Sequence, residues 1–346
     1  MTRAAWPENL LQFPARQAIG AIALAYLQQA AAAAQRLERA VDDEALHDFR
    51  VALRRLRTCL RAHADRIDDC VPKKARRRIR TIAAATGQAR DAEVQRAWLR
   101  SEIGNLPPRR RPALTRLEAR LEQRQRLAYE KIRADVLPDF RRAERKLRKA
   151  LSALAKPPAA AADASLTFAQ AVAPLVRQHV AELKTSLARF KSPAHVEEAH
   201  LARISAKRLR YLLEPVAKRL AIEDTVMREL RVLQDLLGEL RDLQLLVGEL
   251  GAAVEDAAVE QARGLLRRVL KDGTDPARRR APRQGHGYAG LLTAASLAQA
   301  QQERLFRRIR AEYGHQRMAA LAQRVFGLAD QLAANSIVAG GAPAHR

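Results

Sequence analysis

A basic segment that occurs twice constrains the fold of this chain more than any other feature. The first copy runs from His47 to Arg61 and the second from His200 to Glu214. In each copy, a His is followed by a base three residues later, by a β-branched residue, and by bases at positions seven, eight and ten. Because the same pattern is kept in two segments so far apart in the chain, the repeat predicts duplication of a whole structural unit.

Each copy has the periodicity of an amphipathic helix. At about 100° per residue, the bases of each copy fall on one stripe, and Leu, Ala and Phe side chains fall on another. The stripes are His47, Arg50, Arg54, Arg57 and Arg61, and His200, Arg203, Lys207 and Arg210. The first stripe has no acid at the neighbouring helical positions, and a line of like charges costs folding energy unless an anion relieves it. A solvated charged face is the alternative, but the duplication favours a ligand.

Composition indicates an all-α fold with a polyanionic partner. Hydrophobic residues make up 48% of the chain but aromatic residues only 4%, and no segment shows sustained alternation, so packed helices are favoured over sheets. The formal net charge is +25, from 63 Lys and Arg against 38 Asp and Glu. Such an excess predicts binding to nucleic acid, an acidic membrane surface or a polyphosphate.

Several other functions find no support in the sequence. Cys59 and Cys70 form no metal or disulfide pattern, and His195 and His200 are spaced five apart, which separates them around a helix. The chain lacks a P-loop, a carboxylate cluster for Mg²⁺ and an evident nucleophile–base pair. We therefore expect no enzyme, metal or cofactor. Without a signal peptide or a long apolar run, we expect a cytoplasmic protein that does not enter a membrane.

The expected helices follow one order in both halves of the chain, with Lys156-Pro157-Pro158 read as a linker. They span about 15–40, 44–66, 73–102, 112–137, 168–190, 196–220, 223–250, 253–270 and 292–333. Gly87 and Gly238 lie at equivalent places, so the repeat extends into the helix after each motif. Each glycine either serves helix packing or allows close approach of the motif helix or an anion.

The two basic segments, together with the LQDLLGELRD stretch at Leu233–Asp242, resemble the CHAD (conserved histidine α-helical domain) family. The resemblance covers residues 14–335. It implies two pseudosymmetric antiparallel helical bundles, 14–155 and 164–335, that face each other across a basic cleft or pore. It also implies binding of inorganic polyphosphate and no catalysis, so we expect a granule-associated or targeting protein. Residues 336–346 are expected to form a disordered tail.

Carried over residue by residue, the resemblance implies a polyphosphate site built from both motif helices. The first half takes His47, Arg50, Arg54, Arg55 and Arg57, and the second takes His200, Arg203, Lys207, Arg208 and Arg210. The first stripe adds Arg61, and the basic starts of the following helices add Lys73, Arg77, Arg80, Arg228 and Arg231. Glu214 stands where the first copy has Arg61, so it is a poor anion ligand and is expected to pair with a base. For each His, a structural first-turn hydrogen bond is the alternative role.

A helical nucleic-acid-binding protein is the alternative function. Weak, salt-sensitive nucleic-acid binding is expected of any chain this basic. Against a dedicated role stand the low aromatic content and the lack of a helix-turn-helix, zinc-finger or RNA-binding signature. Sulfate or phosphate is expected to occupy the polyphosphate site in a crystal. The sequence leaves oligomeric state, polyphosphate chain length, protein partners and the choice between groove and pore open.

Overall fold

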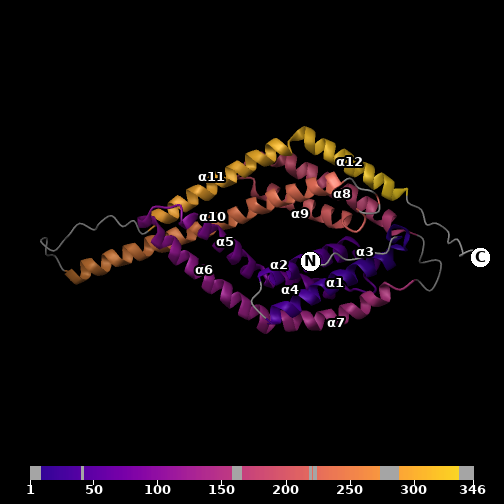
Figure 1. Ribbon diagram of the computed structural model, residues 1–346, viewed down its shortest axis with the longest axis horizontal. Helices are drawn as coiled ribbons and strands as arrows, with labels where there is room; N and C mark the ends of the chain where they lie inside the picture. The colour runs from indigo at the N-terminus through magenta and orange to yellow at the C-terminus, as the bar shows by residue number, and fades with distance from the viewer. Residues whose placement is uncertain are drawn as a thin grey trace, which may run out of the picture. The chain divides into compact units, whose positions relative to one another are not determined.

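The computed structural model describes residues 9–39, 43–157, 166–217, 220, 224–272 and 288–334, and these fold as helices without strands (Figure 1). The expected tail and the arginine-rich loop before residue 288 lie outside the described residues. The α-helices are α1 (Ala15–Arg39), α2 (Asp43–Ala62), α3 (Ala64–Ile67), α4 (Lys73–Ala85), α5 (Gly87–Ile103), α6 (Arg111–Lys131), α7 (Leu137–Leu154), α8 (Phe168–Arg189), α9 (Val196–Leu213), α10 (Asp224–Asp272), α11 (Ala289–Glu312) and α12 (His315–Ala333). The 3-10 helices η1 (Leu10–Gln12) and η2 (Pro108–Arg110) and the π-helix η3 (Ile132–Val136) complete them.

The all-α prediction is confirmed, and the differences lie where helices break. The expected helix 73–102 is two helices, because α4 ends at Ala85, with Thr86 as its C-cap, and α5 begins at Gly87. The expected helix 292–333 is also two, divided at Gly314, where an added Cβ would lie 2.6 Å from the Arg310 carbonyl oxygen. The expected break near Gly251 is wrong, because α10 runs through it without interruption. Helix propensity alone therefore does not show whether a glycine ends a long helix or lies within it.

Pro138 does not end the helical path but is accommodated by a change in helix type. Lacking an N–H, a proline removes one helical hydrogen bond and its ring crowds the preceding turn. The chain widens into the π-helix η3 just before it, and α7 then begins at Leu137 with the proline in its first turn. The helix expected over 112–137 thus continues as α6, η3 and α7.

The helices form two compact units, and each unit draws on both halves of the sequence. The first unit comprises Met1–Gly87, Tyr129–Gly238 and Ile309–Arg346, and the second comprises Gln88–Ala128 and Glu239–Arg308. In the first unit α1 packs on α2 and α7, α8 packs on α9 and α12, and the motif helices α2 and α9 contact each other. The internal duplication and the two facing bundles stay a prediction.

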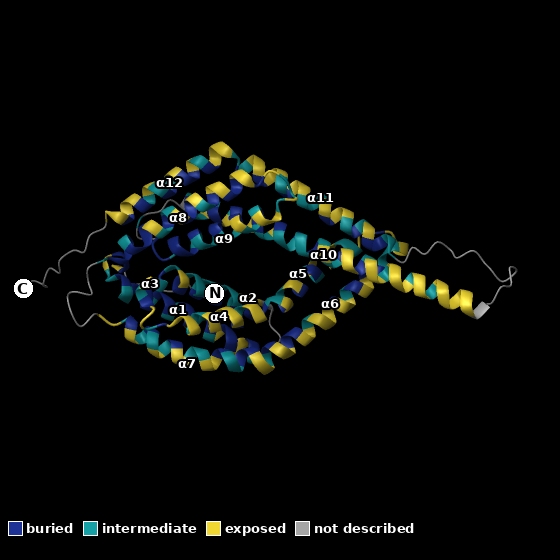
Figure 2. Cartoon of the chain, turned by 180° about the vertical axis from the view of Figure 1, so that it is seen from behind, coloured by how far each residue is buried: buried dark blue, intermediate teal, exposed yellow. Residues whose placement is uncertain are grey.

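The core of the first unit is aliphatic, with a few aromatic side chains, as the composition predicts (Figure 2). Phe49 of α2 meets Phe140 of α7 edge to face, with ring centroids 5.0 Å apart. Helix α1 approaches the end of α7 so closely that a Cβ on Gly20 would lie 2.6 Å from the Ala155 nitrogen. These contacts fix α2, and with it the first basic stripe, against the core.

The starts of α1 and α8 are tied together by backbone hydrogen bonds. The Ala15 N–H donates to the Leu166 carbonyl and the Phe168 N–H donates to the Phe13 carbonyl, each at 2.9 Å. Thr167 then caps α8, because its hydroxyl accepts from the Gln170 N–H while the Gln170 side chain accepts from the Thr167 N–H. This capping box satisfies N–H groups that would otherwise be unpaired.

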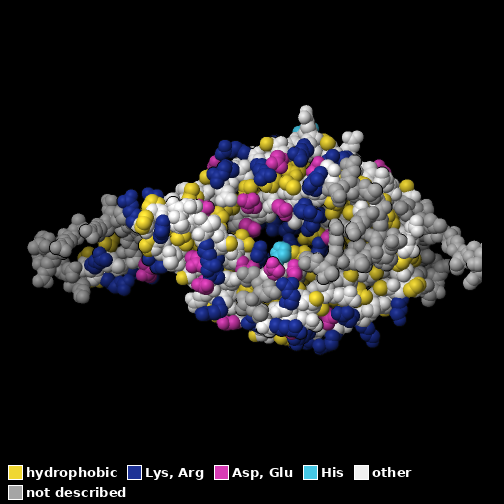
Figure 3. Space-filling view, in the orientation of Figure 1, with side chains coloured by type: hydrophobic (Ala, Val, Ile, Leu, Met, Phe, Trp, Pro, Cys, Tyr) yellow, Lys and Arg dark blue, Asp and Glu magenta, His cyan; other side chains and the backbone are white. Residues whose placement is uncertain are grey.

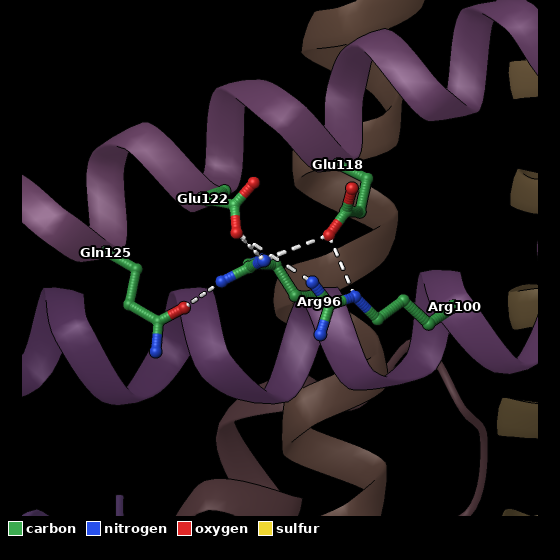
Figure 4. Close-up of polar contacts among 5 residues, drawn as sticks. All are labelled: Arg96, Arg100, Glu118, Glu122 and Gln125. Atoms are coloured by element: carbon green, nitrogen blue, oxygen red, sulfur yellow. Dashed lines mark hydrogen bonds and ion pairs between the residues drawn. The ribbon is translucent and has the colours of Figure 1, made fainter. Parts of the chain in front are cut away.

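Charged side chains join the helices of the second unit. Arg96 and Arg100 of α5 donate to Glu118 of α6, and Arg96 also reaches Glu122 and Gln125 (Figure 4). Arg120 and Arg124 of α6 pair with Asp256 and Glu249 of α10, at 2.7 and 2.8 Å. The Trp98 indole N–H of α5 donates to Gln301 of α11 at 3.0 Å. Ion pairs of arginine therefore join α6 to α5 and to α10 within this unit.

A buried histidine makes the stability of the fold dependent on pH. His63 is 2% exposed, and burial, with Arg66 nearby, lowers its pKa to about 4 from an ordinary 6.5. Its Nδ1 has no hydrogen-bond partner among the described residues. The folded chain keeps this imidazole neutral, whereas the unfolded chain protonates it at higher pH. The contribution of His63 to stability is therefore present above pH 6.5 and is lost as pH falls toward 4.

We expect the His63→Leu variant to be less sensitive to acid than the wild type. Between pH 7 and pH 4.5 the wild type should lose about 2–3 kcal/mol more unfolding free energy than the variant. Urea unfolding at both pH values measures this, and the carboxylates titrate alike in both chains. Equal losses of unfolding free energy in the two proteins would show that His63 does not stay neutral in the folded state.

Candidate anion-binding site

All the predicted site residues lie in the first compact unit, on four helices. Helix α2 carries His47, Arg50, Arg54, Arg55, Arg57 and Arg61, and α9 carries His200, Arg203, Lys207, Arg208 and Arg210. Helix α4 carries Lys73, Arg77 and Arg80, and the first part of α10 carries Arg228 and Arg231. Helix α2 contacts both α4 and α9. The two motif segments, which are far apart in sequence, therefore belong to one structural neighbourhood.

Arg57 lies at the centre of a group of cations from α2 and α4. Burial lowers the pKa of its guanidinium, and the positive charges of Arg80, Arg61 and Arg54 lower it further. Arg54 and Arg61 lie one turn before and one turn after Arg57 on the same helix face, whereas Arg80 comes from the neighbouring helix α4. Like charges held together in a partly buried place are costly, and an anion between them relieves that cost.

Arg61 extends this group across to the second motif helix. Burial lowers the pKa of Arg208 on α9, and the charge of Arg61 on α2 lowers it further, whereas Glu182 raises it. The structure thus places cations of α2, α4 and α9 within electrostatic reach of one another. We call Arg54, Arg57, Arg61, Arg80 and Arg208 the arginine cluster.

The arginine cluster contrasts with the many arginines of the chain that form ion pairs. None of its five members forms an ion pair with a carboxylate of the described residues, whereas Arg16, Arg36, Arg78 and Arg148 all do. Figure 3 shows the ordinary situation on one face, where basic side chains are spread over the surface with acidic ones between many of them. The guanidinium groups of the arginine cluster are therefore available to bind phosphate oxygens through paired N–H donors.

Arg55, unlike the arginine cluster, forms an ion pair with a carboxylate. Its Nε donates to Glu214 Oε2 at 2.9 Å, and its second terminal nitrogen donates to Glu214 Oε1. The guanidinium also lies 5.9 Å from the ring centre of Tyr26 and 6.0 Å from that of Tyr211. The expectation that Glu214 pairs with a base is thereby met, and the pair joins α2 to the end of α9. Because Nε and one terminal nitrogen bind Glu214 in a bidentate pair, we leave Arg55 out of the proposed anion site.

Arg50 and Arg210 also have structural partners. Arg50 donates to the Thr86 hydroxyl at 2.7 Å, which ties α2 to the break between α4 and α5. Arg210 Nε donates to Gln234 of α10 at 2.8 Å, and its guanidinium lies 4.7 Å from the Tyr211 ring centre. Each keeps further N–H donors, so an anion contact by either stays a prediction.

The remaining candidates lie on the same four helices. His47 is exposed, whereas His200, Arg203 and Lys207 are half-buried. Lys73, Arg77, Arg228 and Arg231 are exposed at the starts of α4 and α10. An added Cβ on Gly87 or Gly238 would meet nothing within 4 Å, so neither glycine is required by protein packing. Anion contact at these positions stays a prediction.

Three polar residues next to the cluster were not predicted from the sequence. His179 and Glu182 of α8 are joined by a 2.9 Å hydrogen bond, and the Ser205 hydroxyl of α9 donates to the same Glu182 oxygen at 3.2 Å. Burial lowers the pKa of His179, with Arg208 and Arg61 contributing. The spacing of His179 and Glu182 by three residues is the only sequence signal, and it resembles many helical pairs.

Among the helices that the structure describes, none combines the length and apolar character needed to span a membrane. The described residues also contain no group of three or more His, Cys, Asp or Glu arranged to hold a metal ion. The arginine cluster itself offers permanent positive charge and forked hydrogen-bond donation.

The described residues form helices without strands, and two basic helices are in contact, which defines an all-α protein with an arginine-rich site. The family model described as CHAD domain matches residues 21–250, and the chain belongs to this family. The crystal structure of the CHAD domain from the plant Ricinus communis has a TM-score of 0.59 at 20% identity, covering 90% of this chain and 94% of that one. PptA from Streptomyces chartreusis has a TM-score of 0.55 at 16% identity, covering 92% and 99%. No curated protein matches in sequence.

Proposed function

We propose that this chain binds inorganic polyphosphate through the arginine cluster. The observation that carries the proposal is the convergence of five arginines from α2, α4 and α9 without ion-pair partners among the described residues. Polyphosphate carries no nucleobases that a protein could recognise, so its recognition depends wholly on Coulomb attraction and charge-assisted hydrogen bonds. Membership in the CHAD family supports the same ligand. We further propose that the chain associates with polyphosphate granules in the cytoplasm.

The proposed activity is binding without turnover. Among the described residues, the cluster brings arginines together but places no metal-binding group of acids beside them. Glu182 is engaged in hydrogen bonds with His179 and Ser205. The polyphosphate chain should therefore remain intact after prolonged incubation, which gel electrophoresis and an orthophosphate assay would verify.

Competition between labelled long-chain polyphosphate and excess duplex DNA near physiological salt tests the proposal. We expect polyphosphate to stay bound, because closely spaced arginines match its higher density of charge. DNA should bind weakly and lose affinity steeply with salt. If DNA displaces polyphosphate as readily as unlabelled polyphosphate does, the charge acts as a general field and nucleic-acid binding becomes the better function. Triphosphate that binds as tightly as long chains would show that only one stripe is used.

A further inference from the structure

The last part of α10, within the second compact unit, exposes an apolar stripe. Val259, Leu266, Val269 and Leu270 are 48%, 59%, 64% and 74% exposed, and Ala262 is exposed between them. Figure 2 shows this end of the helix almost wholly exposed. Successive residues of this stripe are three, four, and then three or four positions apart, which places their side chains on one helix face. A face of this kind is typical of a helix that packs against another helix.

A stripe of charges runs alongside the apolar one, and its two halves have opposite sign. Asp256 and Glu260 come first and Arg263 and Arg267 follow, again spaced four, three and four, so all four lie on one flank. In the chain itself, Asp256 pairs with Arg120 at 2.7 Å and Glu260 with Arg263 at 3.2 Å. These pairs are largely exposed, so exchanging them for others costs little.

The acid-then-base order makes this flank complementary to itself in the antiparallel direction. When two copies of α10 lie antiparallel with their apolar stripes in contact, both charged flanks fall on the same side. Asp256 then faces the partner's Arg267, and Glu260 faces the partner's Arg263. In a parallel pair the two flanks would lie on opposite sides and would not meet. The charge order therefore selects one orientation.

Two further features favour a second copy of the chain as the occupant of this face. Residues 253–272 carry four acids and four bases, so this stretch is neutral in a chain of net charge +25 and does not repel its own copy. Residues 273–287, which follow α10 in sequence, contain no Val, Leu, Ile, Met or Phe that could cover the stripe. We propose that the chain forms a homodimer through an antiparallel pairing of the exposed ends of two α10 helices.

The dimer should be weak and dependent on concentration. A helix of about 20 residues is roughly 30 Å long, and two such helices bury an area at the low end for specific complexes. We therefore expect a Kd on the order of micromolar. Sedimentation velocity from about 2 to 200 µM, at roughly 0.15 M salt, measures it.

A pair of charge-reversed variants gives the sharpest test. Arg263→Glu/Arg267→Glu makes the flank wholly acidic, and Asp256→Lys/Glu260→Lys makes it wholly basic. Each variant alone should dimerise at least about tenfold more weakly than the wild type, because like charges then face each other. Mixed in equal amounts, the two should form a heterodimer, because each acid meets a base in the antiparallel arrangement.

Matched single variants test how much the apolar stripe contributes to dimerisation. Leu266→Lys should abolish dimerisation, whereas Leu127→Lys, at a 52% exposed position on α6, should leave it unchanged. Both replaced side chains are exposed, so thermal melting should show folded proteins. A wild type that stays monomeric over the whole range overturns the proposal, even if it binds lipid vesicles. So does a mixture of charge variants that fails to recover the dimer.

Discussion

Reversing the charge of Arg57 should weaken polyphosphate binding by at least about thirtyfold. Arg57 lies among Arg54, Arg61 and Arg80, so the Arg57→Glu variant removes one forked donor and places an acid in the middle of the remaining donors. A charge-assisted contact contributes roughly 2 kcal/mol, and about 1.4 kcal/mol corresponds to a factor of ten. Fluorescence anisotropy with labelled long-chain polyphosphate at constant salt measures the loss.

Arg304→Glu is the matched control, because it changes net charge equally at an exposed position of α11. It should reduce affinity by no more than about threefold, through the general field alone. Arg57→Lys keeps the charge but loses the planar fork, so its effect should lie between the two. If Arg57→Glu and Arg304→Glu weaken binding equally, polyphosphate is held by a diffuse field and the arginine cluster is not its site.

The stability of the Arg57 variants helps to interpret their binding. Burial and three neighbouring cations lower the pKa of Arg57, so its charge is held at a cost in the empty protein. Removing that charge should leave the melting temperature unchanged or raise it. A loss of binding in a protein that melts normally can then be assigned to the lost contact.

The sequence predicted the helices and the helix faces better than it predicted the partners of single arginines. The periodicity of Leu53, Leu56 and Leu60 determined which side of α2 is buried, because burial of a continuous apolar face decides helix orientation. It could not show that Arg55 faces Glu214, since the two are 159 residues apart and meet only through the contact of α2 with α9. Pairing across elements depends on tertiary packing, which one sequence does not specify.

The breaks in the helices were hard to predict for a related reason. Gly248 and Gly251 cost helix propensity, yet α10 continues through both, so the surrounding helix outweighs the local cost. The break at Thr86 and Gly87 leaves the Thr86 hydroxyl to accept from Arg50 of α2. Local propensity could not show that contact, because it joins residues of different helices.

Replacing Arg55 by Met should destabilise the fold. This single variant is therefore not a direct measure of anion binding. The change leaves Glu214 half-buried beside Tyr26 and Tyr211 without its bidentate partner. Buried pairs broken on one side cost about 3–5 kcal/mol, and because this pair is 15% and 24% exposed we expect about 2 kcal/mol. Urea unfolding near pH 7 measures the loss.

The double variant Arg55→Met/Glu214→Leu separates the structural role of Arg55 from a role as ligand. It removes both charges, so most of the lost stability should return, to within about 1 kcal/mol of the wild type. Its affinity for polyphosphate should then stay within about threefold of the wild-type value. A double variant that is stable but binds tenfold more weakly would show that Arg55 contacts the anion directly. The pair with Glu214 would then be one that polyphosphate displaces on binding.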